Sequence, residues 1–261
     1  MMATEMKFGW CGSPANAAQI KQAGLDYVEL QLVPMQLEDD VSFAQAKASV
    51  KDLPLPAPVM SYLFPHDLRL VGPEVHEIRA RAYFDRVLEI LRLAGSSIVV
   101  IGSGWTRNVP DGFARQRAED QYLSALTWLA AALKGSGITL VIEPLNRKES
   151  NQINSVAEAV RFARMLNCTE VRAHADFYHM DEAAENLATL SENAPWLAHI
   201  HLADSGRMNP GTGSYPYAEF FRQLKTAGYQ GLMSAECGLE GEAVAAMKFS
   251  ADFLRQQWQS A

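Results

Sequence analysis

The 261-residue sequence has few cysteines, no glycine-rich nucleotide fingerprint and no low-complexity stretch. Its three cysteines, Cys11, Cys168 and Cys237, are an odd number without metal-type spacing, which argues against a disulfide framework. Each is expected to be a small buried hydrophobic residue, although Cys237 directly follows an acidic residue and could line a site. The glycines do not form the G-x-G-x-x-G pattern between a strand and a helix, so a dinucleotide-binding fold is not expected.

Positive charge is also scarce, and the formal net charge is -7. Proteins that bind DNA or RNA gain most of their affinity from basic side chains on the phosphate backbone, so nucleic acids are not expected partners. No segment approaches 18 uninterrupted apolar residues, and the first residues lack a basic stretch followed by an apolar run. We therefore expect a cytoplasmic protein that acts on small molecules away from membranes. The sequence leaves open whether the chain forms a homo-oligomer.

Short β-rich runs alternate with longer segments of helical periodicity along the whole chain. The eight runs are residues 6–10, 27–32, 57–64, 97–104, 139–145, 171–177, 197–203 and 232–237. The segments between them carry apolar residues at i, i+3, i+4 and i+7, which is typical of helices with one buried face. Such alternation indicates βαβ units and a parallel sheet. Eight units in about 250 residues predict an α/β fold, a (β/α)8 TIM barrel with outer helices, as a single domain over residues 1–261.

Acidic and histidine side chains end four successive predicted strands. They are Glu143 in TLVIE, Asp176 in VRAHAD, His201 in LAHIH and Glu236 in LMSAE. The C-terminal ends of barrel strands converge on one mouth, so we expect these four residues to meet there. One such residue alone is more commonly a helix cap or ion-pair partner, but converging carboxylates repel one another unless a cation lies among them. Three carboxylates and an imidazole suit one hard divalent ion, such as Mn2+ or Mg2+.

Further polar and aromatic residues follow the predicted strands and are candidates for substrate contact. They are His179 in DFYHM, Arg207 in SGRMNPGTG, Glu149 in EPLNRKES, His66 in YLFPHDLRLVGP and Trp105 in GSGWTRNVP. Each has an alternative interpretation as an ordinary loop residue, and its position at the predicted mouth favours a role in binding. His174 and His199 share strand parity with Asp176 and His201, so we expect them one layer below the metal, as hydrogen-bond partners or core residues.

The segments IEPLNR, DFYHM, HIHLADSGRMNPGTG and SAEC resemble the sugar phosphate isomerase/epimerase superfamily, also called xylose-isomerase-like barrels. The likeness covers most of the chain. Within the superfamily, the chain is similar to the ketose 3-epimerases and to hydroxypyruvate isomerase. The histidine at position 201 fits the ketose epimerases better, because hydroxypyruvate isomerase carries glutamine there. The segments FPHDLRLVGP and IGSGWTRNVPDGF match neither group well, which leaves the substrate open.

The resemblance implies roles for individual residues and a reaction class. One Mn2+, Mg2+ or Co2+ ion would bind Glu143, Asp176, His201 and Glu236, with Glu143 and Glu236 also serving as the acid/base pair. His179, Arg207 and Glu149 would hold oxygen atoms of a sugar or keto-sugar, which would be epimerised or isomerised through a metal-stabilised enediolate.

Two other functions stay open. A metal-dependent lyase or dehydratase acting on a keto-sugar or inosose would expel a leaving group from the same enediolate, with Lys148 or His66 as the proton donor. A non-catalytic sugar-binding barrel is less favoured, because all four ligand positions are filled. The apurinic endonucleases of the superfamily fit poorly, since the chain lacks a second Asp-x-His pair downstream of His201 and a basic surface.

Overall fold

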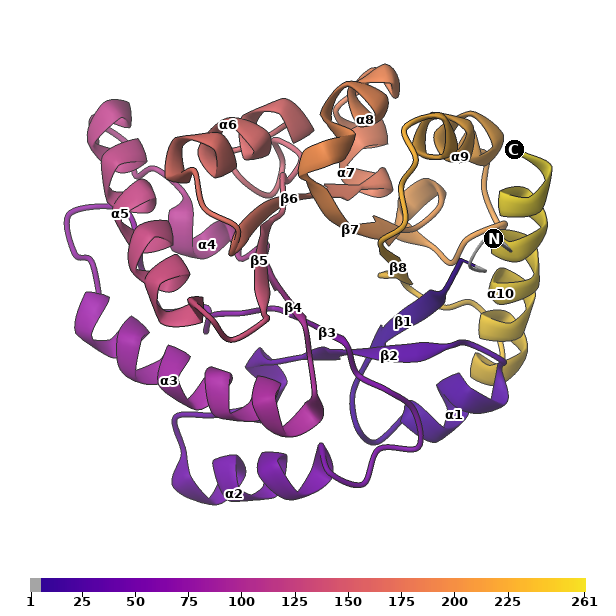
Figure 1. Cartoon of the computed structure of the whole chain (residues 1–261), viewed down its shortest axis with the longest axis horizontal. Coiled ribbons are helices and arrows are strands. Elements are labelled where there is room, and N and C mark those ends of the chain that lie inside the picture. The colour runs from indigo at the N-terminus through magenta and orange to yellow at the C-terminus, as the bar shows by residue number, and fades with distance from the viewer. Residues whose placement is uncertain (1–5) are drawn as a thin grey trace.

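Eight parallel strands form a closed barrel in the computed structural model, which describes residues 6–261 (Figure 1). The strands are β1 (Phe8–Gly12), β2 (Tyr27–Gln31), β3 (Val59–Ser61), β4 (Ile98–Ile101), β5 (Thr139–Ile142), β6 (Val171–Asp176), β7 (Leu197–Leu202) and β8 (Leu232–Ala235). They follow one another around the barrel in sequence order, and β1 pairs with β8 to close it. The predicted (β/α)8 barrel is confirmed.

Helices surround the barrel on its outside (Figure 1). They are α1 (Ala17–Gln22), α2 (Asp40–Ser49), α3 (Glu77–Ala94), α4 (Gly104–Arg107), α5 (Arg115–Leu133), α6 (Val156–Leu166), α7 (Phe177–Glu182), α8 (Ala188–Asn193), α9 (Tyr217–Thr226) and α10 (Ala243–Ser260), with 3-10 turns η1 (Val33–Met35), η2 (Ala194–Trp196) and η3 (Ser205–Arg207). The side chains of Tyr83, Val87 and Leu91 bury one face of α3 against the barrel, as their spacing predicts. Across residues 6–261 we find no helix with the length and apolar character that a bilayer crossing requires.

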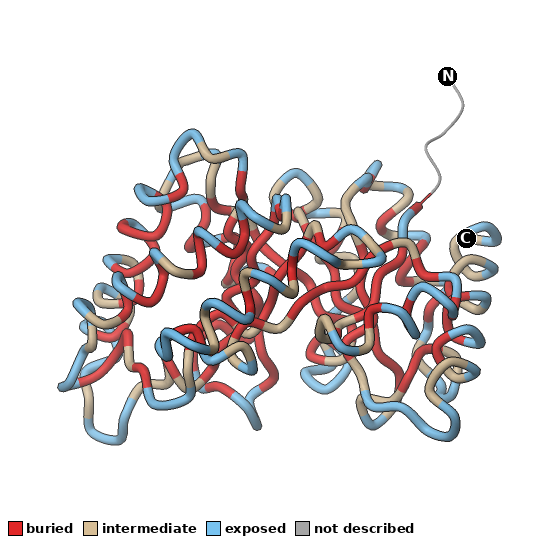
Figure 2. Tube along the Cα trace, turned by 90° about the horizontal axis from the view of Figure 1, so that it is seen from below, coloured by how far each residue is buried: buried red, intermediate tan, exposed pale blue. Residues whose placement is uncertain are grey.

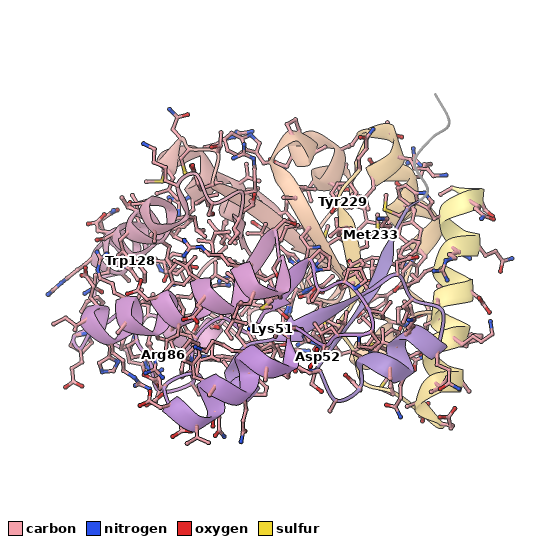
Figure 3. The ribbon with its side chains drawn as sticks, turned by 60° about the horizontal axis from the view of Figure 1, so that its bottom comes forward. Lys51, Asp52, Arg86, Trp128, Tyr229 and Met233 are labelled. Carbon is pink, nitrogen blue, oxygen red and sulfur yellow. The ribbon has the colours of Figure 1, made fainter. Side chains whose placement is uncertain are left out.

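Local signals in the sequence set the ends of several helices. The Ser155 side chain accepts a hydrogen bond from the backbone N–H of Glu158 at 3.2 Å, which caps α6 as the spacing of these residues predicts. Gly24 and Gly228 follow α1 and α9 with φ angles of +83° and +70°, a conformation that glycine adopts without strain. Arg86 lies on α3 in the outer layer (Figure 3). It donates to the carbonyl oxygen of Leu37 at 2.8 Å, which ties α3 to the segment before α2.

The barrel wall separates two apolar regions, and buried residues concentrate along the strands and the inner faces of the helices (Figure 2). The larger region lies between strands and helices. A smaller one consists of Tyr27, Val59, Ile98, Val100 and Val141, which lie at alternating strand positions and fill the N-terminal half of the interior. Gly9 makes room for the Tyr27 ring, because a Cβ at Gly9 would lie 2.1 Å from it. The C-terminal half of the interior is therefore left for polar side chains.

Several strands end earlier than the sequence predicts. The run 57–64 forms only β3, because Tyr62 has a φ of +54° and leaves the extended conformation directly after Ser61. The run 97–104 pairs only as far as Ile101, and Gly104 already begins α4. The apolar runs are thus longer than the strands, and their ends become part of the loops at the barrel mouth.

Candidate active site

The four residues that end the predicted strands meet at the C-terminal end of the barrel. Glu143, Asp176, His201 and Glu236 each offer one ligand-type atom, and these atoms all lie within 4.8 Å of one another. Nδ1 of His201 lies 3.3 Å from Oε1 of Glu143, 3.8 Å from Oδ2 of Asp176 and 3.5 Å from Oε2 of Glu236. All four side chains are buried. Convergence of these residues is what their positions in the sequence predict.

Strand pairing and one glycine position these side chains. Asp176 and His201 are direct partners in the β6–β7 ladder, which has a register shift at Ala173 and His174. Glu143 lies one residue beyond β5, beside Gly102 at the end of β4. A Cβ at Gly102 would lie 1.5 Å from Oε2 of Glu143, so a glycine is needed there to accommodate the carboxylate.

The crowded carboxylates change the protonation of their neighbours. Burial lowers the pKa of His201, but the carboxylates of Glu29 and Glu236 outweigh burial and hold this pKa well above its usual value. Burial raises the pKa of Glu236, and the negative charge of Glu143 raises it further. The site therefore concentrates negative charge that attracts a cation. Three carboxylates and one imidazole are a donor set that fits a hard divalent ion.

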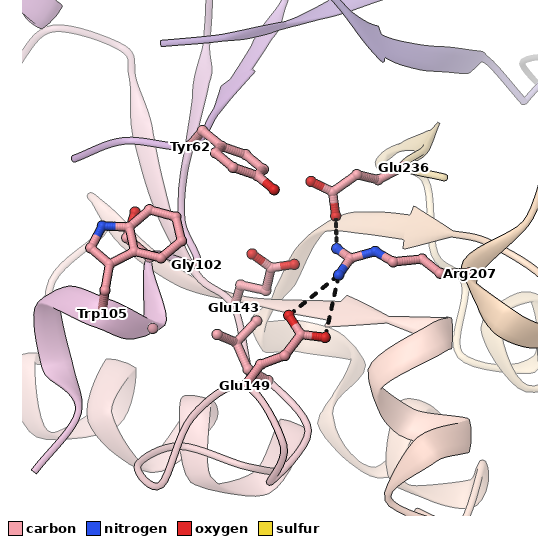
Figure 4. Close-up of a pocket in the computed structure, with 10 residues that line it drawn as sticks. Tyr62, Gly102, Trp105, Glu143, Glu149, Arg207 and Glu236 are labelled. Carbon is pink, nitrogen blue, oxygen red and sulfur yellow. Dashed lines mark hydrogen bonds and ion pairs between the residues drawn. The ribbon is translucent and has the colours of Figure 1, made fainter. Parts of the chain in front are cut away.

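A pocket opens beside this cluster (Figure 4). Its lining consists of Tyr62, Gly102, Ser103, Gly104, Trp105, Glu143, Leu145, Glu149, Arg207 and Glu236. Tyr62 and Trp105 form an aromatic side, while Arg207 and Glu236 lie on the other side (Figure 4). A small molecule in this pocket would meet apolar rings on one side and charged groups on the other.

Arg207 connects two carboxylates of the pocket. Its Nη2 donates to Oε2 of Glu236 at 2.6 Å, and its Nη1 lies 3.3 Å from Oε2 of Glu149 (Figure 4). The backbone of Arg207 has a φ of +60°, which is strained for a residue other than glycine. Arg207 and Glu149, two of the five residues predicted to contact substrate, both line the pocket.

His179 is buried next to the cluster and is not part of the pocket lining. Its backbone N–H donates to Oδ1 of Asp176 at 3.1 Å, so the other carboxylate oxygen is left to face His201. Its Nδ1 lies 2.9 Å from the Asn146 side-chain amide nitrogen. Nε2 of His179 lies 3.9 Å from Oδ2 of Asp176 and has no hydrogen-bond partner among residues 6–261, so it is free to bind a ligand.

The two aromatic candidates have different positions. Trp105 lines the pocket, and its Nε1 donates to the carbonyl oxygens of Phe64 and Pro65, each at 3.1 Å. His66 is exposed and stacks on Trp105 with ring centroids 3.8 Å apart, but it does not line the pocket. His66 therefore supports the Trp105 indole from outside. Lys148 forms an exposed ion pair with Glu182 and likewise lies outside the pocket lining.

Three further residues contribute to the site although the sequence did not point to them. Glu29 is fully buried in β2 and contacts both His199 and His201. A single carboxylate inside the apolar run YVELQL, at an inward-facing position, was a signal that could have found it. Arg107, which ends α4 and binds the backbone carbonyl of Glu143, and Tyr62, which follows β3 and lines the pocket, lie in segments whose sequence predicts no particular contact.

Comparisons with known proteins agree with the motifs. The model of the xylose isomerase-like TIM barrel family matches residues 17–257. The chain is 30% identical over 234 residues to a 3-dehydro-D-guloside 4-epimerase of Escherichia coli (strain K12), covering 85% of this chain and 86% of the relative. It is 26% identical over 225 residues to a D-psicose 3-epimerase of Agrobacterium fabrum, covering 84% and 76%.

Solved structures show the same relationship. A 3-keto-D-glucoside 4-epimerase from E. coli, in its apo form, superimposes with a TM-score of 0.82 at 25% identity, over 97% of this chain and 100% of that one. A D-allulose 3-epimerase from Methylomonas sp., in complex with D-allulose, has a TM-score of 0.84 at 21% identity over 98% of both chains, which shows the shared fold. The resemblance seen in the sequence is confirmed, and the chain belongs to the xylose isomerase-like TIM barrel family.

Proposed function

We propose that this chain is a divalent-metal-dependent epimerase that acts on a keto-sugar. The observation that carries the proposal is the buried group of Glu143, Asp176, His201 and Glu236, whose ligand-type atoms lie within 4.8 Å of one another beside a pocket. The relatives are epimerases, which supports an enzyme of the isomerase class. Their names place the inverted carbon beside a ketone, since "3-dehydro" marks carbon 3 next to carbon 4, and psicose is a 2-ketose.

The same four residues would hold the metal ion. With Mn2+, Mg2+ or Co2+ bound, the site would supply Lewis-acid stabilisation of negative charge on the sugar's carbonyl oxygen. Proton transfer and orientation of the sugar would be carried out by side chains of the protein.

Glu143 and Glu236 are the proposed acid/base pair. They come from the ends of different strands, β5 and β8, and both line the pocket. One carboxylate removes the proton from the carbon next to the carbonyl, which leaves an enediolate, and the other returns a proton to the opposite face. Inversion of that carbon results.

Residues around the pair would orient the sugar. Arg207 carries up to five N–H donors and shares them between Glu149 and Glu236, so hydroxyl groups of a substrate can join this network. Nε2 of His179 is free to bond an oxygen atom near the cluster. The Trp105 indole, which His66 stacks against, offers an apolar surface to the carbon atoms of the sugar.

Metal removal combined with isotope exchange tests the proposal. We expect about one divalent ion per purified chain, loss of activity on chelation, and recovery with Mn2+, Mg2+ or Co2+. In D2O, a keto-sugar substrate should yield an epimer with deuterium on the inverted carbon. Full activity of the metal-free protein would contradict the metal site, and an unsaturated or shortened product would identify a lyase instead.

A further inference from the structure

Glu29 connects β2 to two histidines of β7 across the barrel interior. Its Oε1 lies 2.8 Å from Nε2 of His201, and its Oε2 lies 2.8 Å from Nε2 of His199. All three side chains are fully buried. Strands β2 and β7 are not neighbours in the sheet, because β1 and β8 lie between them. The contacts therefore span the interior, and each oxygen of the carboxylate has its own imidazole partner.

The two ring nitrogens of His201 face different surroundings. Nδ1 faces Glu143, Asp176 and Glu236, while Nε2 faces Glu29. A neutral imidazole has one N–H group and one nitrogen lone pair. An ionised carboxylate at 2.8 Å from Nε2 can only accept, so it selects the tautomer with the proton on Nε2. A divalent ion bound among the carboxylates would take the place of the proton on Nδ1, whose lone pair would then point at the ion.

We propose that Glu29 is a positioning residue, which fixes the orientation and tautomer of His201 so that Nδ1 can bind the divalent ion. The inference rests on the proposed metal-dependent function and adds a residue that neither lines the pocket nor belongs to the four-residue group, although a ligand-type atom of Glu29 also lies within 4.8 Å of one on Cys11 and one on His201. A hydrogen bond from the remote nitrogen to a carboxylate also makes the ligating nitrogen more basic. His199 contributes by bonding the second oxygen, so that the buried carboxylate has two partners.

His174 provides a matched comparison for the hydrogen bond. Its ring packs against the same His201 ring, with centroids 4.2 Å apart in an edge-on arrangement. Neither of its ring nitrogens has a hydrogen-bond partner within residues 6–261. His174 therefore packs against His201, as Glu29 does, but it makes no hydrogen bond to that ring. A change at His174 alters the packing against His201 without removing a hydrogen bond, whereas a change of Glu29 to glutamine preserves size and removes the charge.

The experiment measures Co2+ affinity of the metal-free full chain by calorimetric titration for three proteins: wild type, Glu29→Gln and His174→Leu. We expect Glu29→Gln to weaken Co2+ binding by about 10- to 100-fold, because the amide has no charge and its single oxygen can accept from only one of the two imidazoles, while its NH2 group faces the other. His174→Leu should bind Co2+ as tightly as wild type. Thermal unfolding of the metal-free proteins serves to show that all three are folded.

A spectroscopic measurement on wild type makes the test independent of the variants. In 15N-labelled protein loaded with diamagnetic Zn2+, long-range 1H–15N correlations should show His201 protonated on Nε2, with that proton shifted downfield by its bond to Glu29. Protonation of His201 on Nδ1 instead would overturn the inference even if Glu29→Gln failed to fold. Equal Co2+ affinity of Glu29→Gln and wild type would overturn it while leaving the proposed function intact. Absence of Co2+ binding by wild type would overturn the metal site itself, and with it the role of Glu29.

Discussion

Arg107 donates a hydrogen bond from Nη2 to the backbone carbonyl oxygen of Glu143 at 2.7 Å. Its other guanidinium nitrogens donate to the carbonyl oxygens of Ile101 at 3.3 Å and Gln152 at 3.1 Å. The side chain is fully buried. One buried cation therefore ties the end of β4 to the residue that follows β5 and to the loop beyond it. This fixes the backbone from which the Glu143 carboxylate enters the site.

Replacing Arg107 with methionine should destabilise the fold. The change leaves three buried carbonyl oxygens without their charged donor, which should lower the free energy of unfolding by about 2–4 kcal/mol. Urea denaturation measures the effect. Arg222→Met is the control, because Arg222 is exposed and pairs with Glu219 on the same helix, so its midpoint should match wild type. Equal midpoints for both variants would mean that the buried contacts of Arg107 contribute nothing to stability.

Glutamine substitutions at Glu143 and Glu236 should separate proton transfer from metal binding. Glutamine keeps an oxygen for the ion but cannot accept the substrate's proton, so turnover should fall by about 100- to 10,000-fold in each variant. Metal content per chain, measured by elemental analysis, should fall far less. Glu89→Gln is the control, since Glu89 lies outside the pocket lining in an ion pair with Lys47. Near-wild-type turnover in both site variants would rule out the acid/base pair.

The barrel and the four-residue cluster could be predicted from sequence because both follow from local pattern plus one rule of topology. Strand and helix periodicities are visible in short windows, and parallel closure brings the C-terminal strand ends together. Glu143, Asp176, His201 and Glu236 each end an apolar run, so this rule alone places them side by side.

Contacts that depend on pairing across the interior or on loop geometry could not be predicted in the same way. Glu29 meets His201 only because closure of the barrel through β1 and β8 brings the inward faces of β2 and β7 together, a relationship with no local signature. Tyr62 enters the pocket because its backbone has a φ of +54°, which ends β3 early, and nothing in the run APVMSYLF marks that turn. The sequence predicts that both His66 and Trp105 contact substrate, yet only Trp105 lines the pocket, because His66 stacks on the Trp105 ring from outside.

Glu185 should make stability depend on pH. Burial raises the pKa of its carboxyl group to about 7, although a hydrogen bond from the N–H of Val156 at 3.0 Å opposes the rise. The folded state then holds a proton between about pH 4.5 and 7 that the unfolded state has released, so stability falls as pH rises through this window and stays low above it. Because the side chain is only partly buried, solvent screening reduces the loss to about 1–2 kcal/mol.

Glu185→Gln should remove this pH dependence, because glutamine is uncharged at every pH and keeps an oxygen to accept from Val156. Urea unfolding should find the variant more stable than wild type at pH 8 by about 1–2 kcal/mol, and equal to it at pH 4.5. Glu192→Gln, at an exposed position, should follow wild type at both pH values. A variant that is less stable than wild type at pH 8 would show that the ionised carboxylate stabilises α6, which contradicts the predicted destabilisation.

Tyr62 should contribute a hydrogen bond to the substrate. Its ring lines the pocket, and its hydroxyl group points toward the Glu236 carboxylate (Figure 4). Burial, together with the negative charge of Glu236, raises the pKa of this phenol, so it keeps its proton and acts as a donor at neutral pH. A phenol held beside a proposed proton-transfer group can bond an oxygen atom near the reacting carbon, because both groups face the same space.

Tyr62→Phe removes this donor and preserves the ring, so kcat/KM should fall by about 3- to 10-fold, the effect of losing one neutral hydrogen bond. Metal affinity should not change, because Tyr62 is outside the ligand group. Tyr83→Phe is the matched control: the Tyr83 hydroxyl is buried on α3 without a hydrogen-bond partner in the described part of the chain, and it does not line the pocket.

Steady-state kinetics of the two variants compare the loss of a hydroxyl group in the pocket with the same loss elsewhere. Equal kcat/KM values for wild type and Tyr62→Phe would mean that the pocket uses the Tyr62 ring for shape alone, whereas a fall of 100-fold or more would place the phenol in the proton transfer itself.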